Sequence, residues 1–341
     1  MNQAVSNKKT ITSVPEHTVE IITNSGEGAQ KCAQIFGQTC AKMGNGVWTV
    51  EIIPAEIEPP HHTVTSTSGN IVRFGTGKVT NWGDQSKLAI AFNDQVCLSR
   101  HRLKSFDDNC IILQESMWEN HEDEKIRTMY AEAMEEMSSK NYRFIQVPIE
   151  EETLKVVDNP SHGKNMFALG LLAEIYQRDL AIIEKQIAHI FRHKSAKITE
   201  TNVQLVKNGM EWARENLDFQ FDIETVASEE KRVVMNGNQA AALGAIAAGM
   251  EMCAMYPITP ATSVSHELAA IIESYGGIVH QSEDEIAAAG VALGASYGGK
   301  VALTVTSGPG MALKTEFLGL VIMTEIPMVV LDVQRGGPST G

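Results

Sequence analysis

Apolar residues in the first 216 positions follow two patterns, short runs between turn residues and the spacing of an amphipathic helix. The short runs predict strands at Thr18–Thr23, Val47–Ile53, Asn70–Phe74, Leu88–Phe92, Cys110–Gln114 and Phe144–Val147. Helical spacing begins near Cys32 and predicts further helices at Glu122–Lys140, Asn165–Ile175, Leu180–Phe191 and Thr199–Asn216. This alternation predicts an α/β fold whose first domain is a mixed sheet with helices packed late in the domain.

Two polar stretches border this region. Residues 1–17 lack an apolar run behind Lys8 and Lys9, so we expect a flexible tail rather than a signal peptide. Residues 217–232 are acidic and show no clean period, which predicts a linker between two domains. The expected organisation is therefore a tail (1–17), a first domain (18–216), a linker (217–232) and a second domain (233–341).

From Val233 the composition shifts toward alanine and glycine, and strand, loop and helix patterns alternate. We expect a strand from Val233, a helix at Gln239–Met250, a turn at Tyr256–Pro260 and a second helix that ends near Ser274. Further strands at Ile278–His280, Val301–Val305 and Met328–Asp332 run into the polar segments Gln281–Glu285, Thr306–Gly310 and Gln334–Gly341. Because repeated strand–loop–helix units form parallel sheets whose loops meet at one edge, this pattern predicts a functional site there.

Two motifs in the first domain invite a functional interpretation. Gly26 and Gly28 have G-x-G spacing before a helix, but Lys31 stands where a dinucleotide fingerprint needs its third glycine. A tight strand-to-helix turn is the alternative to a dinucleotide site, and an NAD-dependent dehydrogenase fits this incomplete fingerprint poorly. His61 and His62 follow two prolines, and we expect a solvated loop there because neighbours on an extended segment point to opposite sides.

Charge and cysteine content narrow the class of protein. The 28 basic and 42 acidic residues give a formal net charge of -14, and no basic stripe is interleaved with aromatics, so nucleic acid is not an expected partner. No apolar stretch is long enough to span a membrane. The five cysteines lack C-x-x-C spacing, which predicts reduced thiols in a cytoplasmic protein and no metal site on this chain.

Four segments in series resemble a known family: Tyr256–Pro260, the acidic helix start at Gln281–Glu285, Ser307–Gly310 and Gln334–Gly341. Their order and spacing are similar to those of the alpha subunit of 2-oxoacid:ferredoxin oxidoreductases, and most like the 2-oxoglutarate branch.

The first domain resembles the gamma domain of the same enzymes at Gly26–Gln30 and Asn165–Gly170, although Ala29 and Lys31 replace glycines common in that loop. Together the two resemblances imply a fused gamma–alpha arrangement over roughly Val19 to Gly341.

This resemblance implies that residues 233–341 are a pyrimidine-binding domain for thiamine diphosphate, with an incomplete sheet at Gly341. The diphosphate, its Mg²⁺ and a [4Fe-4S] cluster would belong to a separate beta subunit in an (alpha-beta)2 heterotetramer. The implied reaction converts 2-oxoglutarate and coenzyme A to succinyl-CoA and CO2, reduces ferredoxin and is reversible in principle. Alternatives are the same chemistry on pyruvate or another 2-oxoacid, or a noncatalytic assembly subunit.

Glu285 is the candidate catalytic residue. Thiamine chemistry needs a carboxyl group hydrogen-bonded to a nitrogen of the pyrimidine ring, and such a group must be partly desolvated to share a proton near neutral pH. We expect Ile286 and Ala287–Ala289 to surround it, and the family's glutamate precedes a glycine by nine residues, as Glu285 precedes Gly294. Glu283 is the rival, and the acidic run could instead stabilise a helix N-terminus.

The resemblance also assigns residues that contact the cofactor, namely Thr259, Pro260, Ser307 and Gly308. The two residues of the turn would lie beside the ring, and the serine and glycine would let the backbone approach it. A simple turn role is the alternative for Thr259.

Substrate binding is assigned to Thr259, Arg335 and Thr340. The Arg335 guanidinium could bind the substrate carboxylate through paired hydrogen bonds. A role in anchoring its own loop is the alternative.

Overall fold

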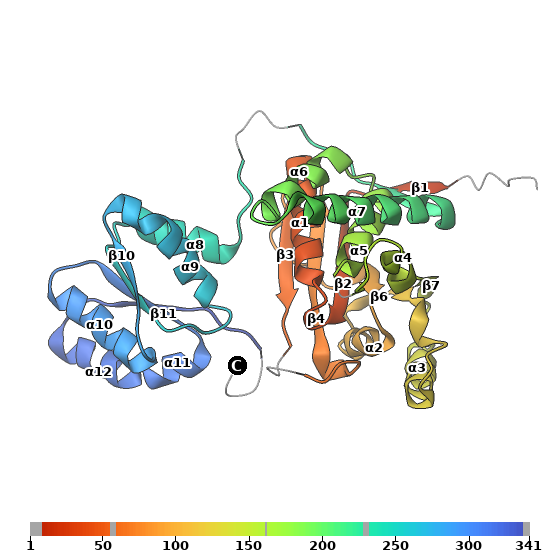
Figure 1. Ribbon diagram of the computed structural model, residues 1–341. Coiled ribbons are helices and arrows are strands. Elements are labelled where there is room, and N and C mark those ends of the chain that lie inside the picture. Colours follow the sequence, from red (N-terminus) through yellow and green to blue (C-terminus); the bar gives the residue numbers. More distant parts are fainter. Residues whose placement is uncertain (1–8, 55–58, 161, 228–231, 337–341) are drawn as a thin grey trace, which may run out of the picture. The chain divides into compact units, whose positions relative to one another are not determined.

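The computed structural model describes residues 9–54, 59–160, 162–227 and 232–336. The chain divides into two compact units, Met1–Lys231 and Arg232–Gly341. Each unit has its own sheet, flanked by helices, and its own buried core (Figure 1).

The N-terminal unit is built on a mixed six-stranded sheet in the order β3-β4-β2-β5-β6-β7. Strand β4 is antiparallel to both β2 and β3, whereas β2, β5, β6 and β7 are parallel. All residues of β2 except the first are buried, as expected for the apolar run that predicted it. The strands are β2 Glu16–Asn24, β3 Gly46–Ile52, β4 Thr67–Gly75, β5 Ser86–Ala91, β6 Phe106–Glu115 and β7 Arg143–Val147. The predicted mixed sheet is therefore confirmed.

Helices of this unit follow the strands and then collect late in the domain. They are α1 Ala29–Lys42, α2 Asp94–Arg102, α3 Glu124–Met137, α4 Ile149–Leu154, α5 Lys164–Ile175, α6 Leu180–Ile190 and α7 Ala196–Asn216. Helix α5 is buried almost completely because it packs against α1, α4 and α7. Sequence spacing did not predict α2, whose inner face buries the polar residues Asp94, Gln95 and Arg100.

The close packing of α5 on α7 depends on two glycines. A Cβ atom on Gly170 would lie 2.1 Å from the Val206 carbonyl oxygen, and one on Gly209 would lie 2.1 Å from the Phe167 carbonyl oxygen. Neither backbone oxygen can move without shifting its helix, so the two helices approach at a distance that only glycine permits.

Gly170→Ala is therefore expected to lower the free energy of unfolding by about 1–3 kcal/mol, the usual cost of overpacking a core. Thermal or urea unfolding of the chain measures this effect. Gly77→Ala is the matched control, because nothing lies within 4 Å of a Cβ at that loop position. Equal stability of the two variants would show that the helices separate without cost.

The expected flexible tail (1–17) and linker (217–232) each contain a strand, which corrects the two predictions for those strand residues. Residues 1–8 of the tail and 228–231 of the linker lie outside the described residues. Strand β1 (Thr10–Ser13), from the tail, pairs in parallel with β8 (Phe219–Asp222), from the linker. Phe219 and Ile223 are buried in the core of the N-terminal unit, so the start of the acidic segment is held in place. Strands of four residues are too short to show a period, which is why the pattern missed them.

The C-terminal unit contains a four-stranded sheet that is parallel throughout, in the order β10-β9-β11-β12, and the predicted parallel sheet is confirmed. Its strands are β9 Met252–Met255, β10 Ile278–Gln281, β11 Ala302–Thr306 and β12 Val329–Asp332. Its helices are α8 Gly237–Ala247, α9 Thr262–Ile271, α10 Glu285–Tyr297, α11 Gly308–Leu313 and α12 Thr315–Thr324.

The two faces of this sheet have different cores. Cys253 and Met255 of β9 pack in the cluster that includes residues of α8 and α9, whereas Ala254 faces a small cluster with Ala288 and Ala292 of α10. Alternate residues of a strand point to opposite faces, so this division follows from the sequence of β9. Alanines on the second face let α10 lie close to the sheet.

The strand expected from Val233 is wrong. Residues 232–236 have no helix or strand, and the Val233 side chain is 77% exposed. Helix α8 begins instead at a capping box, in which the Asn236 side chain accepts from the Gln239 backbone and the Gln239 side chain accepts from the Asn236 backbone. Across the described residues, no helix is both long and apolar enough to cross a membrane.

Candidate functional site

The carboxyl ends of the four parallel strands gather the loops that carry the candidate residues. Thr259 and Pro260 follow β9, Glu285 follows β10, Ser307 follows β11 and Arg335 follows β12. The residue after β10 and the residue after β12 each donate to the last residue of the neighbouring strand, from Ser282 N to Met255 O (2.8 Å) and from Val333 N to Thr306 O (2.9 Å). The predicted residues therefore lie along one edge of one sheet, apart from Thr340, which is outside the described residues.

Glu285 is the first residue of α10. The two acidic residues before it show which side chain caps the helix and which is exposed. The Asp284 side chain caps the helix by accepting from Ala287 N at 2.7 Å, so the stabilising role of the acidic run belongs to that residue. The Glu283 side chain is exposed, whereas Glu285 is half-buried. These observations favour Glu285 over its rival.

The surroundings of Glu285 differ from the expectation. Ile286 is exposed, because it faces away from the sheet, and the side chain of Glu285 lies instead against the start of α11. A Cβ atom on Gly310 would lie 2.6 Å from Glu285 Cγ, 3.3 Å from Glu285 Oε1 and 2.1 Å from Thr306 Oγ1. The absence of a side chain at Gly310 thus makes the space that the glutamate occupies.

Three buried polar atoms at this edge have no hydrogen-bond partner within the described parts of the chain. They are the Oγ atoms of Ser282 and Ser307 and the Oδ1 atom of Asp332, which follow or end β10, β11 and β12. A buried polar atom without a partner costs roughly 1–3 kcal/mol, so each of these atoms is a candidate contact for a bound polar group. Ser282 and Asp332 belong to opposite sides of the sheet, because β10 and β12 are its two outer strands.

The Thr259–Pro260 turn contains a cis peptide bond and is supported from α8. Asn238 Nδ2 donates to Pro260 O at 3.2 Å and also to Ser263 Oγ, and Thr262 N donates to Ile258 O at 3.0 Å. Thr259 itself is exposed and Pro260 is half-buried. Hydrogen bonds therefore hold the backbone of the turn, and the Thr259 residue is exposed to solvent.

Ser307 precedes α11 with an extended backbone, and Gly308 begins that helix. The segment expected as a loop is therefore the junction between a strand and a short helix. Arg335 is half-buried three residues beyond β12, beside a loop in which Gln334 Nε2 donates to Asp332 Oδ2 at 2.8 Å.

One residue that the sequence did not single out touches the candidate glutamate directly. Lys314 is completely buried, and its Nζ donates to the Glu285 carbonyl oxygen at 2.8 Å and to Thr304 Oγ1 at 3.0 Å. Burial lowers the pKa of Lys314, and the nearby carboxylates of Glu285 and Asp284 raise it. The sequence around Lys314 does not predict this contact, because its partner Glu285 lies 29 positions away.

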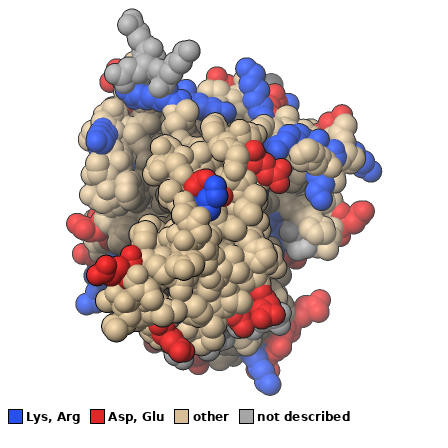
Figure 2. Space-filling view, turned by 90° about the vertical axis from the view of Figure 1, so that its left-hand side faces the viewer, with Lys and Arg blue, Asp and Glu red and all other residues tan. Residues whose placement is uncertain are grey.

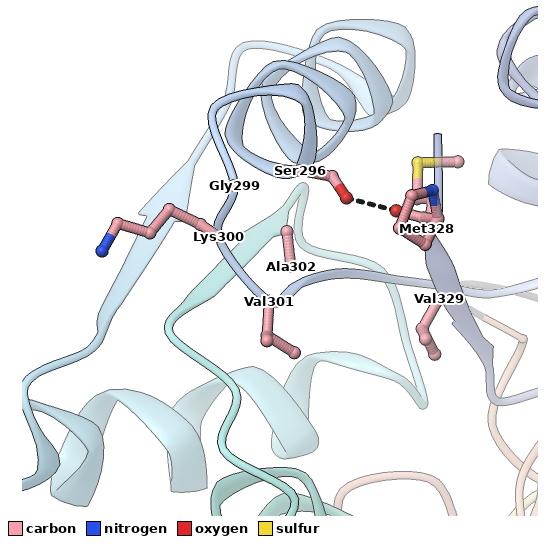
Figure 3. A pocket seen from close by; sticks show the side chains of 8 residues that line it. Ser296, Gly299, Lys300, Val301, Ala302, Met328 and Val329 are labelled. Carbon is pink, nitrogen blue, oxygen red and sulfur yellow. Dashed lines mark hydrogen bonds between the residues drawn. The ribbon is translucent and has the colours of Figure 1, made fainter. Parts of the chain in front are cut away.

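A cavity of about 310 Å³ lies at the opposite, amino-terminal edge of the same sheet. Figure 3 shows Ser296 from the end of α10 bonded to the Pro327 carbonyl oxygen above β12, with Val301 and Val329 beside it. None of the candidate residues lines this cavity, so it is separate from the predicted site.

In the glycine turn of the N-terminal unit, Gly28 is in close contact with another part of the same unit. Gly28 has a φ of 85° and packs on α5, where Asn165 Nδ2 donates to its carbonyl oxygen at 3.2 Å. A Cβ atom on Gly28 would lie 2.5 Å from the same Nδ2 atom. These contacts support the tight-turn interpretation over the dinucleotide one.

The histidine loop corrects another expectation, because His62 is buried. Its Nε2 lies 2.8 Å from Asp94 Oδ1, its ring stacks on Trp118 at 4.3 Å, and its backbone N donates to Asn24 Oδ1. A φ of 54° turns His62 inward.

All five cysteines are buried thiols, and no group of three or more His, Cys, Asp or Glu side chains in the described ranges is arranged to hold a metal ion. Burial raises the pKa of Cys40 and of Cys253 to about 12, so both are protonated at neutral pH.

Comparison with known proteins assigns the chain to a family. Residues 19–212 match the family model described as "Pyruvate ferredoxin/flavodoxin oxidoreductase", and residues 243–341 match "Pyruvate flavodoxin/ferredoxin oxidoreductase, thiamine diP-bdg". Subunit KorA of the 2-oxoglutarate oxidoreductase of Mycobacterium tuberculosis is 33% identical over 335 residues, which are 93% of this chain and 50% of that relative. Subunit KorA of the 2-oxoglutarate synthase of Methanothermobacter marburgensis is 50% identical over 107 residues, which are 31% of this chain and 28% of the relative.

A solved structure is similar over both units. It is the 2-oxoglutarate:ferredoxin oxidoreductase from Magnetococcus marinus with 2-oxoglutarate, coenzyme A and succinyl-CoA bound, with a TM-score of 0.76 and 29% identity. The match covers 96% of this chain and 54% of that one, so the present chain spans about half the length of these two long relatives. Because the first family model covers more than half of the chain, the protein belongs to the pyruvate ferredoxin/flavodoxin oxidoreductase family, and residues 243–341 belong to its thiamine diphosphate-binding domain.

Proposed function

We propose that this chain is the gamma and pyrimidine-binding part of the large subunit of a thiamine diphosphate-dependent 2-oxoglutarate:ferredoxin oxidoreductase. The enzyme would convert 2-oxoglutarate and coenzyme A to succinyl-CoA and CO2 and reduce ferredoxin. One observation carries the proposal: Glu285 is half-buried against Gly310, at an edge where buried polar atoms of Ser282, Ser307 and Asp332 lack partners.

Glu285 and Ser307 fit an aminopyrimidine ring, which offers both N–H donors and ring-nitrogen acceptors. The Glu285 carboxyl would share a proton with a ring nitrogen, while Ser307 and Gly308 would let the α11 backbone approach the ring. The Thr259–Pro260 turn would bound the site from the neighbouring loop. When bound, thiamine diphosphate supplies the nucleophile for the keto carbon of a 2-oxoacid.

Arg335 and Thr259 would bind the substrate, together with Thr340. A guanidinium presents two parallel N–H donors to a carboxylate, which suits the group next to the keto carbon.

Arg335→Met is expected to raise the KM for the 2-oxoacid about 10–100-fold, since a hydrogen bond to a charged group contributes roughly 1.5–3 kcal/mol. Steady-state kinetics with Arg335→Lys, which keeps the charge, is the control, and a fall in kcat without a change in KM would instead favour a loop-anchoring role.

The C-terminal unit exposes many large apolar side chains, among them Tyr256, Tyr275, Ile278, Ile286, Tyr297, Leu313, Leu320, Ile322 and Met323. Figure 2 looks toward the C-terminal unit and shows a broad area without charged residues. Exposed large apolar side chains on a unit with a broad uncharged area are a feature of protein interfaces. The partner that we propose is a beta subunit with the diphosphate site, Mg²⁺ and a [4Fe-4S] cluster, in an (alpha-beta)2 heterotetramer.

The experiment is reduction of a low-potential electron acceptor driven by 2-oxoglutarate and coenzyme A, with the full-length protein co-expressed with its beta partner. Activity with 2-oxoglutarate supports the proposal. Activity with pyruvate or another 2-oxoacid alone would keep the reaction and overturn the substrate. A correctly assembled complex that is inactive with every 2-oxoacid would favour a noncatalytic assembly role.

A further inference from the structure

Lys314 lies at the junction of α11 and α12 and is completely buried, although the two hydrogen bonds of its Nζ atom both go to uncharged acceptors, Glu285 O and Thr304 Oγ1. Lysines are rarely buried without an ion-pair partner, because removing an ammonium ion from water is costly. No described carboxylate lies within 4.0 Å of this Nζ atom. A lysine kept here at such a cost needs an explanation beyond packing.

Two short links connect this lysine to the candidate catalytic residue. The first is the bond from Nζ to the Glu285 carbonyl oxygen, in the first turn of α10. The second runs through α11, because Lys314 N donates to Gly310 O at 3.1 Å, and Gly310 is the residue against which the Glu285 side chain lies. The same helical turn therefore contacts both the main chain and the side chain of Glu285.

Thr304 completes the arrangement. It is a fully buried residue of β11, in the middle of the sheet, and its hydroxyl accepts the second Nζ hydrogen bond. Lys314 thus joins three elements, the start of α10, the strand β11 and the α11–α12 junction.

The charges that face the ammonium group come from the start of α10. Glu285 and Asp284 are the carboxylates that act on it. Asp284 already accepts the capping bond from Ala287 N, which leaves Glu285 as the carboxylate without a hydrogen bond to the described residues.

We propose that Lys314 is a positioning residue for Glu285, because it fixes the main chain at the start of α10 to strand β11. This inference rests on the proposed role of Glu285 toward thiamine diphosphate. Lys314 does not touch the cofactor, and it acts only through the glutamate.

The test compares Lys314→Met with Lys300→Met in the full-length complex. Lys300 is the matched control because it belongs to the same unit but forms an exposed ion pair with Glu251 at 2.8 Å. Three quantities are measured, the dissociation constant of thiamine diphosphate by calorimetry and kcat and KM for the 2-oxoacid. Without the lysine, the start of α10 is no longer tied to β11, so the cofactor affinity and kcat are each expected to fall about tenfold or more while KM stays unchanged. Lys300→Met should leave all three quantities in place.

Two further variants separate the hydrogen bonds of the lysine from its bulk. Lys314→Arg keeps donors of similar reach and should retain most of the cofactor affinity and kcat, whereas Lys314→Gln keeps a shorter donor and should restore them in part relative to methionine. In the Glu285→Gln background the reacting carboxyl is gone, so Lys314→Met should lower kcat little further.

Three results would overturn the inference. The first is a stable Lys314→Met complex with the wild-type cofactor affinity and kcat. The second is a loss of kcat that is equally large in the Glu285→Gln background, and the third is an equal loss in Lys300→Met. A wild-type complex that binds thiamine diphosphate but turns over no 2-oxoacid would remove the proposed reaction alone, because the affinity measurement needs no turnover.

Discussion

Glu285→Gln is expected to lower kcat/KM for the 2-oxoacid by about 10²–10⁴-fold, the range over which a positioned acid–base group accelerates proton transfer. Glutamine has nearly the same size and keeps a hydrogen-bonding group beside Gly310, but its amide cannot exchange a proton with a ring nitrogen. The loss should therefore fall on the chemical step, with the fold of the C-terminal unit preserved. Acceptor-reduction assays of the assembled complex measure it.

Glu283→Gln is the matched control for this prediction. It makes the same chemical change two residues earlier, at a side chain that is exposed. Near-wild-type activity is expected, and a severe loss in Glu283→Gln with an active Glu285→Gln would transfer the catalytic role to Glu283. Circular dichroism and size-exclusion chromatography of both complexes exclude misassembly as the cause of any loss.

Gly310→Ala is expected to lower the activity at least about tenfold and to destabilise the C-terminal unit by roughly 1–3 kcal/mol. The added methyl group would meet Thr306 Oγ1 at 2.1 Å and Glu285 Cγ at 2.6 Å, so the glutamate must leave its present place. Displacing a reacting group by about 1 Å can reduce a rate by about a hundredfold. Thermal unfolding and the acceptor-reduction assay measure the two effects.

Gly319→Ala, in α12 of the same unit, is its control. Nothing lies within 4 Å of a Cβ at Gly319, and alanine favours a helix over glycine by about 1 kcal/mol. That variant should be at least as stable as the wild type and as active. Wild-type activity in Gly310→Ala would mean that Glu285 does not need its position against α11.

The elements that the sequence predicted well are those whose burial shows in a local pattern. Strand β2 is a continuous apolar run and is buried along nearly its whole length. Strands β1 and β8 could not be predicted, because each has four residues and their pairing joins positions more than 200 residues apart. Likewise α2 buries Asp94 and Arg100, so its inner face carries no apolar period.

The place of the candidate residues at one edge of the sheet was predictable, because each of them follows a strand of a parallel sheet. The roles of Glu285 and Ser307 stay predictions. The contacts that define the surroundings of Glu285 were not predictable, because they join separate elements. Gly310 makes room for Glu285 across 25 positions, and Lys314 reaches the same residue from α11. His62 was misjudged for a similar reason, since its partner Asp94 lies 32 positions away.

An experimental structure of the full-length complex with thiamine diphosphate bound tests the proposed role of Glu285 most directly. We expect a ring nitrogen of the pyrimidine to lie about 2.6–3.2 Å from a Glu285 carboxylate oxygen, at the carboxyl edge of the β10-β9-β11-β12 sheet. Ser307 and Gly308 should contact the same ring. A pyrimidine bound to Glu283, or bound away from this edge of the sheet, would contradict that role.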